Sequence, residues 1–128
     1  MANIQYRTIF VVDDNEMFSQ MLKDHLSGNP MFKVAVFNTG EDCLKNLYQN
    51  PDIIFLDYYL NDVSKEAADG LEILTEIKKF SKSIHVIMLS SQERYGVALQ
   101  SISKGAEQYV IKDEDAFSKI DTIIQDIR

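Results

Sequence analysis

Ile53-Ile54-Phe55-Leu56-Asp57 is the stretch that decides the fold. Four consecutive apolar residues, preceded by Asn50-Pro51-Asp52, are typical of a strand that is buried on both faces, as in a parallel sheet. Asp57 stands where that strand ends, and open α/β sheets carry their chemistry at the carboxyl ends of their strands. The stretch therefore predicts a central parallel strand with a site at its end.

Three more apolar runs, each the length of a strand, end in residues that can do chemistry. They are Ile9–Val12 before Asp13 and Asp14, Val86–Leu89 before Ser90 and Ser91, and Tyr109–Ile111 before Lys112. The carboxyl ends of parallel strands share one edge of a sheet. We therefore expect three carboxylates, a hydroxyl and an ammonium group to gather at that edge.

Strands and helices are predicted to alternate along the chain. The predicted strands are Thr8–Val12, Lys33–Phe37, Ile53–Asp57, Ile84–Leu89 and Gln108–Ile111. Four helices are predicted to begin at Asn15, Thr39, Asp69 or Gly70, and Asp113. A further helix is predicted to span Glu93–Ser103. Residues at helical spacing that we expect on buried faces include Met17, Phe18, Met21, Tyr48, Phe80, Leu99, Ile102, Phe117, Ile120, Ile124 and Ile127.

This alternation predicts a doubly wound α/β fold, a five-stranded parallel sheet with helices on both faces. Right-handed crossovers leave a flavodoxin-like and a Rossmann-like strand order. A glycine-rich first turn would favour dinucleotide binding, but that turn holds Asp13-Asp14-Asn15, which suits a cation. We expect the flavodoxin-like (βα)5 order 2-1-3-4-5, in a single domain over residues 1–128.

Composition narrows the classes of function. The formal net charge of −7 disfavours direct nucleic-acid binding by this domain, because such binding needs a basic patch. No apolar run approaches the ~20 residues of a membrane helix, and a single cysteine fits a reducing compartment. We therefore expect a cytoplasmic protein that binds no membrane. Cys43, His25 and His85 are interpreted as non-catalytic.

The predicted strand order brings Asp13, Asp14 and Asp57 together, because the first and third strands are neighbours. Three close carboxylates repel one another and raise each other's pKa. A hard divalent cation, Mg²⁺ with Mn²⁺ as an alternative, would relieve that repulsion. Asp57 could then act as a nucleophile that forms an aspartyl-phosphate, while Lys112 supplies a charge and Ser90 a hydrogen bond.

Five motifs in this order resemble the receiver domain of two-component response regulators, the chemotaxis-regulator type included. The resemblance covers about Thr8–Arg128. The motifs are Val11-Val12-Asp13-Asp14-Asn15, Ile54-Phe55-Leu56-Asp57, Asp69-Gly70-Leu71-Glu72, Met88-Leu89-Ser90-Ser91 and Tyr109-Val110-Ile111-Lys112.

The resemblance implies a phosphorylation switch rather than a turnover enzyme. Asp57 would accept a phosphoryl group from the phosphohistidine of a histidine kinase or phosphotransfer protein. The resemblance implies that Asp14 binds Mg²⁺ directly, that Asp13 binds it largely through water, and that the Tyr59 backbone carbonyl adds a ligand. Lys112 would contact the phosphoryl group. Ser90 would move toward that group after transfer, and Tyr109 would swing inward behind Ser90. The face of the fourth helix, fifth strand and fifth helix would then bind a downstream protein or an output domain outside these residues.

The chain departs from the family pattern in four places. Asp113 follows Lys112 where proline is usual. A cis bond without proline costs ~3 kcal/mol, so the sequence leaves open whether this peptide is cis as in the family, or trans with a different aim for Lys112. The segment between Asp57 and Gly70 is longer than usual, a candidate for partner specificity. Tyr59 and Gln92 stand where the family tunes dephosphorylation, and we expect Tyr59 to slow it. Ser91 replaces a smaller residue.

Three other functions remain alternatives. A haloacid-dehalogenase-like phosphatase also forms an aspartyl-phosphate, but it needs a second aspartate two residues after the nucleophile, where this chain has Tyr59. A phosphorylation-independent receiver-like module would have lost one of the acidic residues or the lysine, and none is lost. A flavin-binding module is disfavoured because the chain has no tryptophan and no phosphate-binding loop after the first strand.

Overall fold

The sheet has the predicted topology. The structure is a computed structural model that describes residues 6–60, 69–91 and 95–127. Its five strands are β1 (Arg7–Val12), β2 (Phe32–Phe37), β3 (Ile53–Asp57), β4 (His85–Ser90) and β5 (Gln108–Ile111). They pair in parallel in the order β2-β1-β3-β4-β5, which confirms the flavodoxin-like order.

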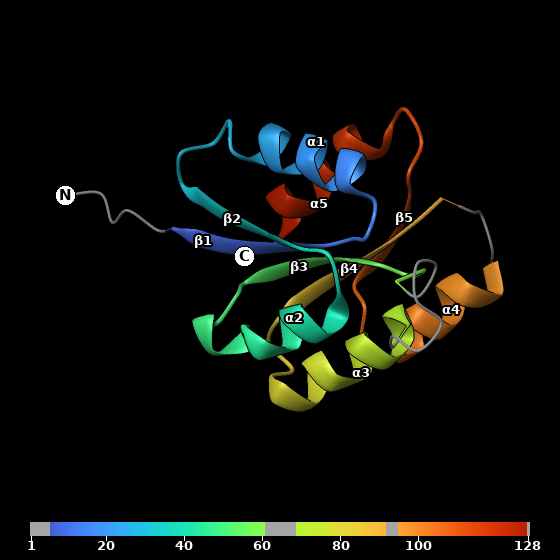
Figure 1. The fold of residues 1–128 in the computed structure, drawn as a ribbon. Coiled ribbons are helices and arrows are strands. Elements are labelled where there is room, and N and C mark those ends of the chain that lie inside the picture. The colour runs from blue at the N-terminus through green and yellow to red at the C-terminus, as the bar shows by residue number, and fades with distance from the viewer. Residues whose placement is uncertain (1–5, 61–68, 92–94, 128) are drawn as a thin grey trace.

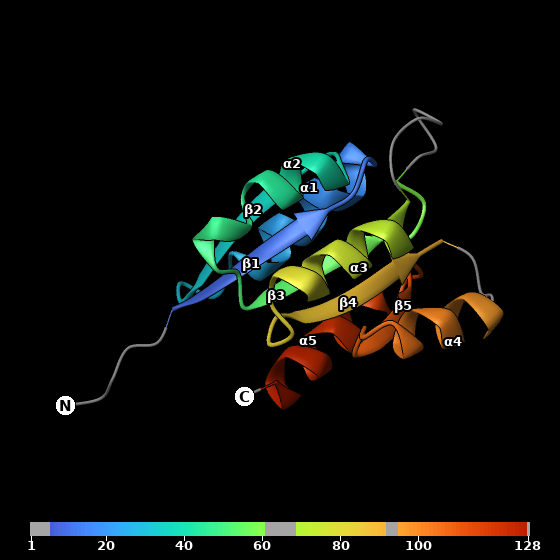
Figure 2. The same cartoon turned by 90° about the horizontal axis from the view of Figure 1, so that it is seen from below.

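Helices cover both faces of this sheet. They are α1 (Glu16–Leu26), α2 (Gly40–Lys45) with the 3₁₀ turn η1 (Leu47–Gln49), α3 (Gly70–Phe80), α4 (Tyr95–Ser103) and α5 (Ala116–Asp126). Figure 1 shows α1 and α5 on one face and α2, α3 and α4 on the other, and Figure 2 shows the same arrangement from below. No helix in the described part of the chain is long and apolar enough to cross a membrane.

The central strand β3 separates two hydrophobic clusters. All five of its residues are buried, as its unbroken apolar run predicted. Ile54 and Leu56 pack with residues of α2 and α3, whereas Ile53 and Phe55 pack with residues of α1 and α5. Successive side chains of a strand point to opposite faces, so one strand anchors both layers.

Three of the predicted helix caps are confirmed. Asn15 Oδ1 accepts a hydrogen bond from the Phe18 N–H at 3.1 Å, and Thr39 Oγ1 accepts one from the Asp42 N–H at 3.1 Å. Asp69 Oδ1 likewise accepts from the Glu72 N–H at 2.9 Å. Each cap satisfies a backbone N–H group that the first turn of a helix leaves without a partner.

The predicted Asp113 cap is wrong. The last helix begins at Ala116, and Asp113 lies in the turn before it, where its Oδ1 accepts a hydrogen bond from the Asp115 N–H at 2.9 Å. An aspartate that bonds the backbone two residues ahead makes an Asx turn, which competes with helix capping. The predicted isoleucine stripe of α5 is buried nonetheless.

The second helix is shorter than predicted, and the fourth ends at Ser103 as predicted. The second ends at Lys45 and continues as η1, which leaves Tyr48 71% exposed. For the fourth, α4 is described from Tyr95, and the predicted residues 93–94 lie outside the described residues, as does the polar segment 61–68.

Several apolar residues predicted to be buried lie at the surface. They are Met17, Met21, Phe80, Leu99 and Ile102. In α1, Leu22 and Leu26 are the apolar residues that are buried, and in α3 they are Ile73, Leu74 and Ile77. A helix that lies flat on a sheet buries one narrow stripe, so periodicity alone overestimates the buried face.

The start of α3 lies against the end of β3. A Cβ atom added at Gly70 would meet the Asp57 carbonyl oxygen at 2.6 Å and Tyr58 Cα at 2.7 Å, both backbone atoms that cannot swing away. The Gly70 N–H donates to the Tyr58 carbonyl at 3.0 Å. Glycine is needed here because only a residue without a side chain allows this approach.

We expect Gly70→Ala to lower the free energy of unfolding by about 2 kcal/mol, because β3 and α3 must separate to admit the methyl group. Urea unfolding followed by circular dichroism measures this change. Gly96→Ala is the matched control, since that glycine is helical and has no atom within 4 Å of an added Cβ. The control should gain about 0.5–1 kcal/mol. Equal effects at both glycines would contradict the proposed packing of α3.

Candidate functional site

The register of the sheet assembles the site. Val12 pairs with Leu56, Asp57 with Leu89, and Ser90 with Ile111, so the residues that follow or end these strands reach one edge. Backbone hydrogen bonds continue the pairing past the strands. These bonds run from Asp13 N–H to the Phe37 carbonyl (3.0 Å), Tyr58 N–H to the Leu89 carbonyl (2.9 Å) and Lys112 N–H to the Ser90 carbonyl (2.7 Å). The rigid sheet therefore sets the site residues' backbone positions.

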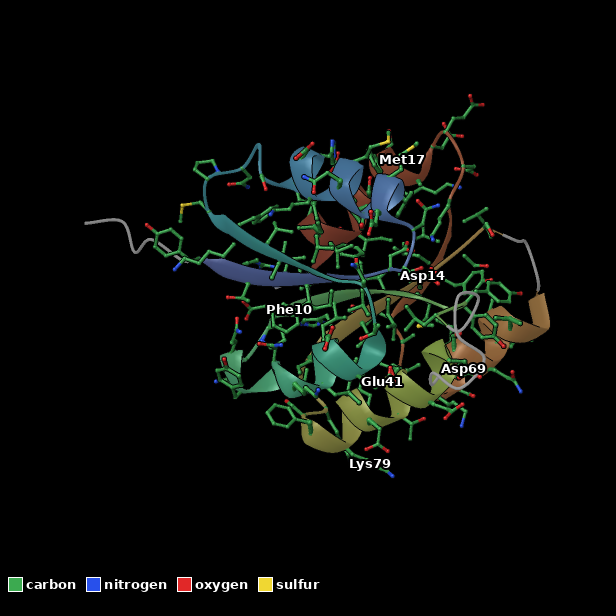
Figure 3. The ribbon with its side chains drawn as sticks, viewed as in Figure 1. Phe10, Asp14, Met17, Glu41, Asp69 and Lys79 are labelled. Carbon is green, nitrogen blue, oxygen red and sulfur yellow. The ribbon has the colours of Figure 1, made fainter. Side chains whose placement is uncertain are left out.

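Three carboxylates meet at this edge, as predicted. One oxygen each from Asp13, Asp14 and Asp57 can be chosen so that all lie within 4.8 Å of one another. Asp13 is fully buried and Asp57 is 4% exposed, whereas Asp14 is half-buried at the end of β1 (Figure 3). The Asn15 N–H donates a hydrogen bond to Asp13 Oδ1 at 2.9 Å and so orients the Asp13 carboxylate.

Lys112 joins two of these carboxylates. Its Nζ lies 2.6 Å from Asp13 Oδ2 and 3.4 Å from Asp57 Oδ1, and its side chain is only 10% exposed. The Lys112–Asp113 peptide is trans, and so is every other peptide bond in the described part of the chain. Aspartate in place of proline thus leaves the ammonium group in contact with Asp57.

Burial raises the pKa of the Asp57 carboxyl to about 7. The nearby negative charge of Asp13 also contributes to this raised pKa, against the lowering effects of the Lys112 ammonium and the Tyr59 N–H. A buried carboxylate that is crowded by another is a group that binds cations well, since a cation relieves both costs. A divalent cation beside Asp57 would lower this pKa and favour the ionised carboxylate.

The donor set fits a hard divalent cation. Carboxylate oxygens are the ligands that Mg²⁺ prefers, and Mg²⁺ commonly takes one or two of them and completes its shell with water and phosphate oxygens. Asp13, Asp14 and Asp57 offer such oxygens from two neighbouring strand ends. The described residues contain no second cluster of three potential ligands of this kind.

The remaining predicted site residues are spread around this centre. Ser90 ends β4 and is fully buried, and Ser91 after it is exposed. Tyr59 is half-buried, its N–H donates to Asp57 Oδ1 at 3.4 Å, and its ring packs edge-to-face on Tyr58 with centroids 4.7 Å apart. Gln92 lies outside the described residues.

Tyr109 occupies the sheet's edge strand β5. It is half-buried against the hydrophobic cluster of α2 and α3, and it also lines a shallow surface groove of about 420 Å³ between β5 and α5. This tyrosine therefore contacts the core on one side and the solvent-facing groove on the other.

Sequence reasoning missed two structural partners of the site. Phe18 was predicted only as a core residue, yet its ring lies under Lys112, with Nζ 4.8 Å from the ring centroid. Gly70 was predicted as a helix start, not as the contact that lets α3 touch the Asp57 carbonyl. Helical periodicity marks Phe18 as inward-facing, but no local pattern identifies a partner 94 positions later in the chain.

Cys43 takes no part in this chemistry. It is fully buried in the cluster between the sheet and α2 and α3, and burial raises the pKa of its thiol to about 12. A thiol with such a pKa stays protonated at neutral pH and is a poor nucleophile. His25 and His85 instead form side-chain pairs with Asp121 and Glu107.

Comparison with known proteins identifies a family. A family described as the response regulator receiver domain matches residues 9–127. The chemotaxis protein CheY of Listeria monocytogenes is 30% identical over 105 residues, which are 81% of this chain and 84% of CheY. The transcriptional regulatory protein ZraR of Klebsiella oxytoca is 32% identical over 88% of this chain, which spans only 24% of the length of ZraR.

Solved structures agree on the fold. A CheY-like receiver domain protein from Methanospirillum hungatei superposes with a TM-score of 0.80 at 20% identity, covering 96% of this chain and 94% of that one. The BeF₃-activated DrrB receiver domain superposes with a TM-score of 0.79 at 26% identity, covering 94% and 99%.

The raised pKa of Asp57 predicts a pH-dependent stability in the absence of divalent cations. Between pH 3.8 and about 7 the folded protein holds this proton more tightly than the unfolded chain does, so this group's contribution to stability falls as the pH rises. We expect Asp57→Asn to be more stable than the wild type at pH 8 by about 2 kcal/mol, half of the ~4 kcal/mol that the full shift would give.

Chemical unfolding of both proteins in chelator from pH 4 to pH 8 measures this difference, which should close toward pH 4. Asp126→Asn, at an exposed position of α5, is the control and should show no such pH-dependent gain. A stability difference for Asp57→Asn that does not vary with pH would contradict the raised pKa.

Proposed function

This chain belongs to the family of response regulator receiver domains, and we propose that it is a phosphorylation switch whose acceptor is Asp57. The observation that carries the proposal is the Lys112 ammonium 3.4 Å from Asp57 Oδ1, beside two further carboxylates at the end of a buried strand. Nucleophile, counter-charge and cation ligands are thus held in one place before any phosphoryl donor arrives.

The proposed reaction moves one phosphoryl group. A carboxylate oxygen of Asp57 attacks the phosphorus of a phosphohistidine on a histidine kinase or a phosphotransfer protein. An O–P bond forms as the P–N bond breaks, and its electron pair returns to the imidazole nitrogen. The product is an aspartyl-phosphate, and hydrolysis later restores the carboxylate.

Charge neutralisation is what this reaction mainly needs. A bound Mg²⁺, with Mn²⁺ as an alternative, would neutralise charge on the transferred oxygens, held by Asp13, Asp14, Asp57 and the Tyr59 backbone carbonyl. Lys112 would place its ammonium against one phosphoryl oxygen, at the expense of its present contact with Asp57. The buried carboxylates orient these groups and exclude bulk water.

Readout of the phosphoryl group is proposed to run through Ser90 and Tyr109. The Ser90 hydroxyl would hydrogen-bond the phosphoryl group in one state only, which biases an existing equilibrium. Tyr109 then changes its position between the core and the β5–α5 groove, and the α4-β5-α5 face binds a downstream protein or an output domain. We propose this as a cytoplasmic switch without a turnover substrate; the DrrB relative, activated by BeF₃, is consistent with it.

The test is phosphorylation by a small donor. Incubation with acetyl phosphate and Mg²⁺ should add one phosphoryl group to the wild type by intact mass and none to Asp57→Asn, and chelator should abolish the gain. Lys112→Arg is a second variant that keeps the charge but alters the geometry, and it should react more slowly. No gain in the wild type from any phosphodonor would favour the phosphorylation-independent interaction module.

Tyr59 generates a prediction about the lifetime of the product. Its backbone N–H donates to Asp57 Oδ1 at 3.4 Å and its half-buried ring packs on Tyr58, so we expect the ring to hinder water that attacks the phosphoryl group. Tyr59→Asn should lose the phosphoryl group several-fold faster, measured by intact mass after the donor is removed. Tyr59→Phe keeps the ring and should match the wild type; turnover of Tyr59→Asn no faster than wild type would refute the shielding role.

A further inference from the structure

A lysine side chain needs more than opposite charges to hold one position. Four rotatable bonds let its ammonium group move among nearby acceptors, and Lys112 has two of them, at 2.6 Å in Asp13 and 3.4 Å in Asp57. Both carboxylates are themselves reaction components in the proposed function, because one gains a phosphoryl group and both would face a cation. Neither offers a constant partner through the reaction.

Phe18 offers such a constant partner. Its ring centroid lies 4.8 Å from Lys112 Nζ, within the range of a cation–π contact, and Lys112 is nearly buried, which strengthens the contact. The attraction comes from the ring's quadrupole, which does not change when Asp57 changes its charge. The ring also excludes water from one side of the ammonium group.

The Phe18 ring is itself fixed. Phe117 of α5 packs edge-on against it, with centroids 5.9 Å apart and an interplanar angle of 60°. The His25 ring stacks on Phe117 at 5.0 Å and 30°, and His25 Nε2 lies 2.8 Å from Asp121 Oδ1. A continuous line of contacts thus joins α1 to α5 and ends under Lys112.

We propose that Phe18 is a positioning residue for phosphoryl transfer, acting through the Lys112 ammonium; this rests on the proposed function. The ring restricts Lys112 to the side of the site that faces Asp13 and Asp57, so that the ammonium group is in place when the phosphoryl group arrives. Phe18 itself touches no reacting atom. Its effect must therefore disappear when the lysine is removed.

The first readout needs neither metal nor phosphoryl donor. Protons near the face of an aromatic ring have NMR signals shifted upfield, so the Lys112 ε-methylene and ammonium signals of the metal-free protein should be shifted in the wild type. Phe18→Tyr should keep the shift and Phe18→Leu should lose it. Met17→Leu is the control, since Met17 is in the same turn of α1 but points away from the sheet (Figure 3) and is 75% exposed.

The second readout is the rate of phosphorylation by acetyl phosphate. Phe18→Leu should react about 5-fold more slowly at saturating donor, equivalent to about 1 kcal/mol, and Phe18→Tyr should recover most of the rate. In a Lys112→Ala background the Phe18→Leu change should have no further effect, because the residue through which it acts is gone.

Two outcomes would overturn the proposal: unshifted Lys112 signals in the wild type, or a Phe18→Leu loss that persists unchanged without Lys112. The latter would mean that Phe18 only packs α1. If the wild type takes no phosphoryl group at all, the proposed function fails, while the NMR signals still decide whether Phe18 positions Lys112.

Discussion

The structure depends on a conflict of charge at the end of its central strand. Asp57 is buried beside the buried Asp13, and the negative charge of Asp13 adds to the cost of ionising Asp57. A sheet with a looser register would let the two groups move apart. Here β1, β3 and β4 pair in parallel up to the last residues before the site, which holds the carboxylates of Asp13 and Asp57 together. A positive charge beside these carboxylates is therefore strongly stabilising.

Much of the fold, and the gathering of the site residues at one edge of the sheet, could be predicted from the sequence because the sheet is regular. An unbroken apolar run predicted β3 as buried on both faces, and parallel pairing then required Asp13, Asp57 and Lys112 to share an edge. Asn15, Thr39 and Asp69 were predictable caps, because a short polar side chain before an apolar stripe satisfies free N–H groups locally. Each of these inferences uses interactions that are close in sequence or imposed by strand order.

The remainder depends on packing between helices, which local patterns do not encode. Met17, Phe18 and Met21 are all apolar positions of one helix, yet Met17 and Met21 lie at the surface while Phe18 packs on Phe117 of α5 and contacts Lys112. Asp113 could cap a helix or make an Asx turn, and the choice is decided by where α5 must start to pack on β5. Which large apolar residues remain at the surface likewise depends on how wide a stripe the sheet can cover.

The close approach at Gly70 also brings together the two ends of the segment that connects β3 to α3. Tyr58 is bonded to β4 through its N–H and to Gly70 through its carbonyl, so the end of β3 and the start of α3 are held together. Lengthening a closed segment of this kind costs only ~0.6 kcal/mol for each doubling. Residues can therefore be added or removed between Leu60 and Asp69, close to Asp57, while the strand and helix ends that hold the carboxylates keep their positions.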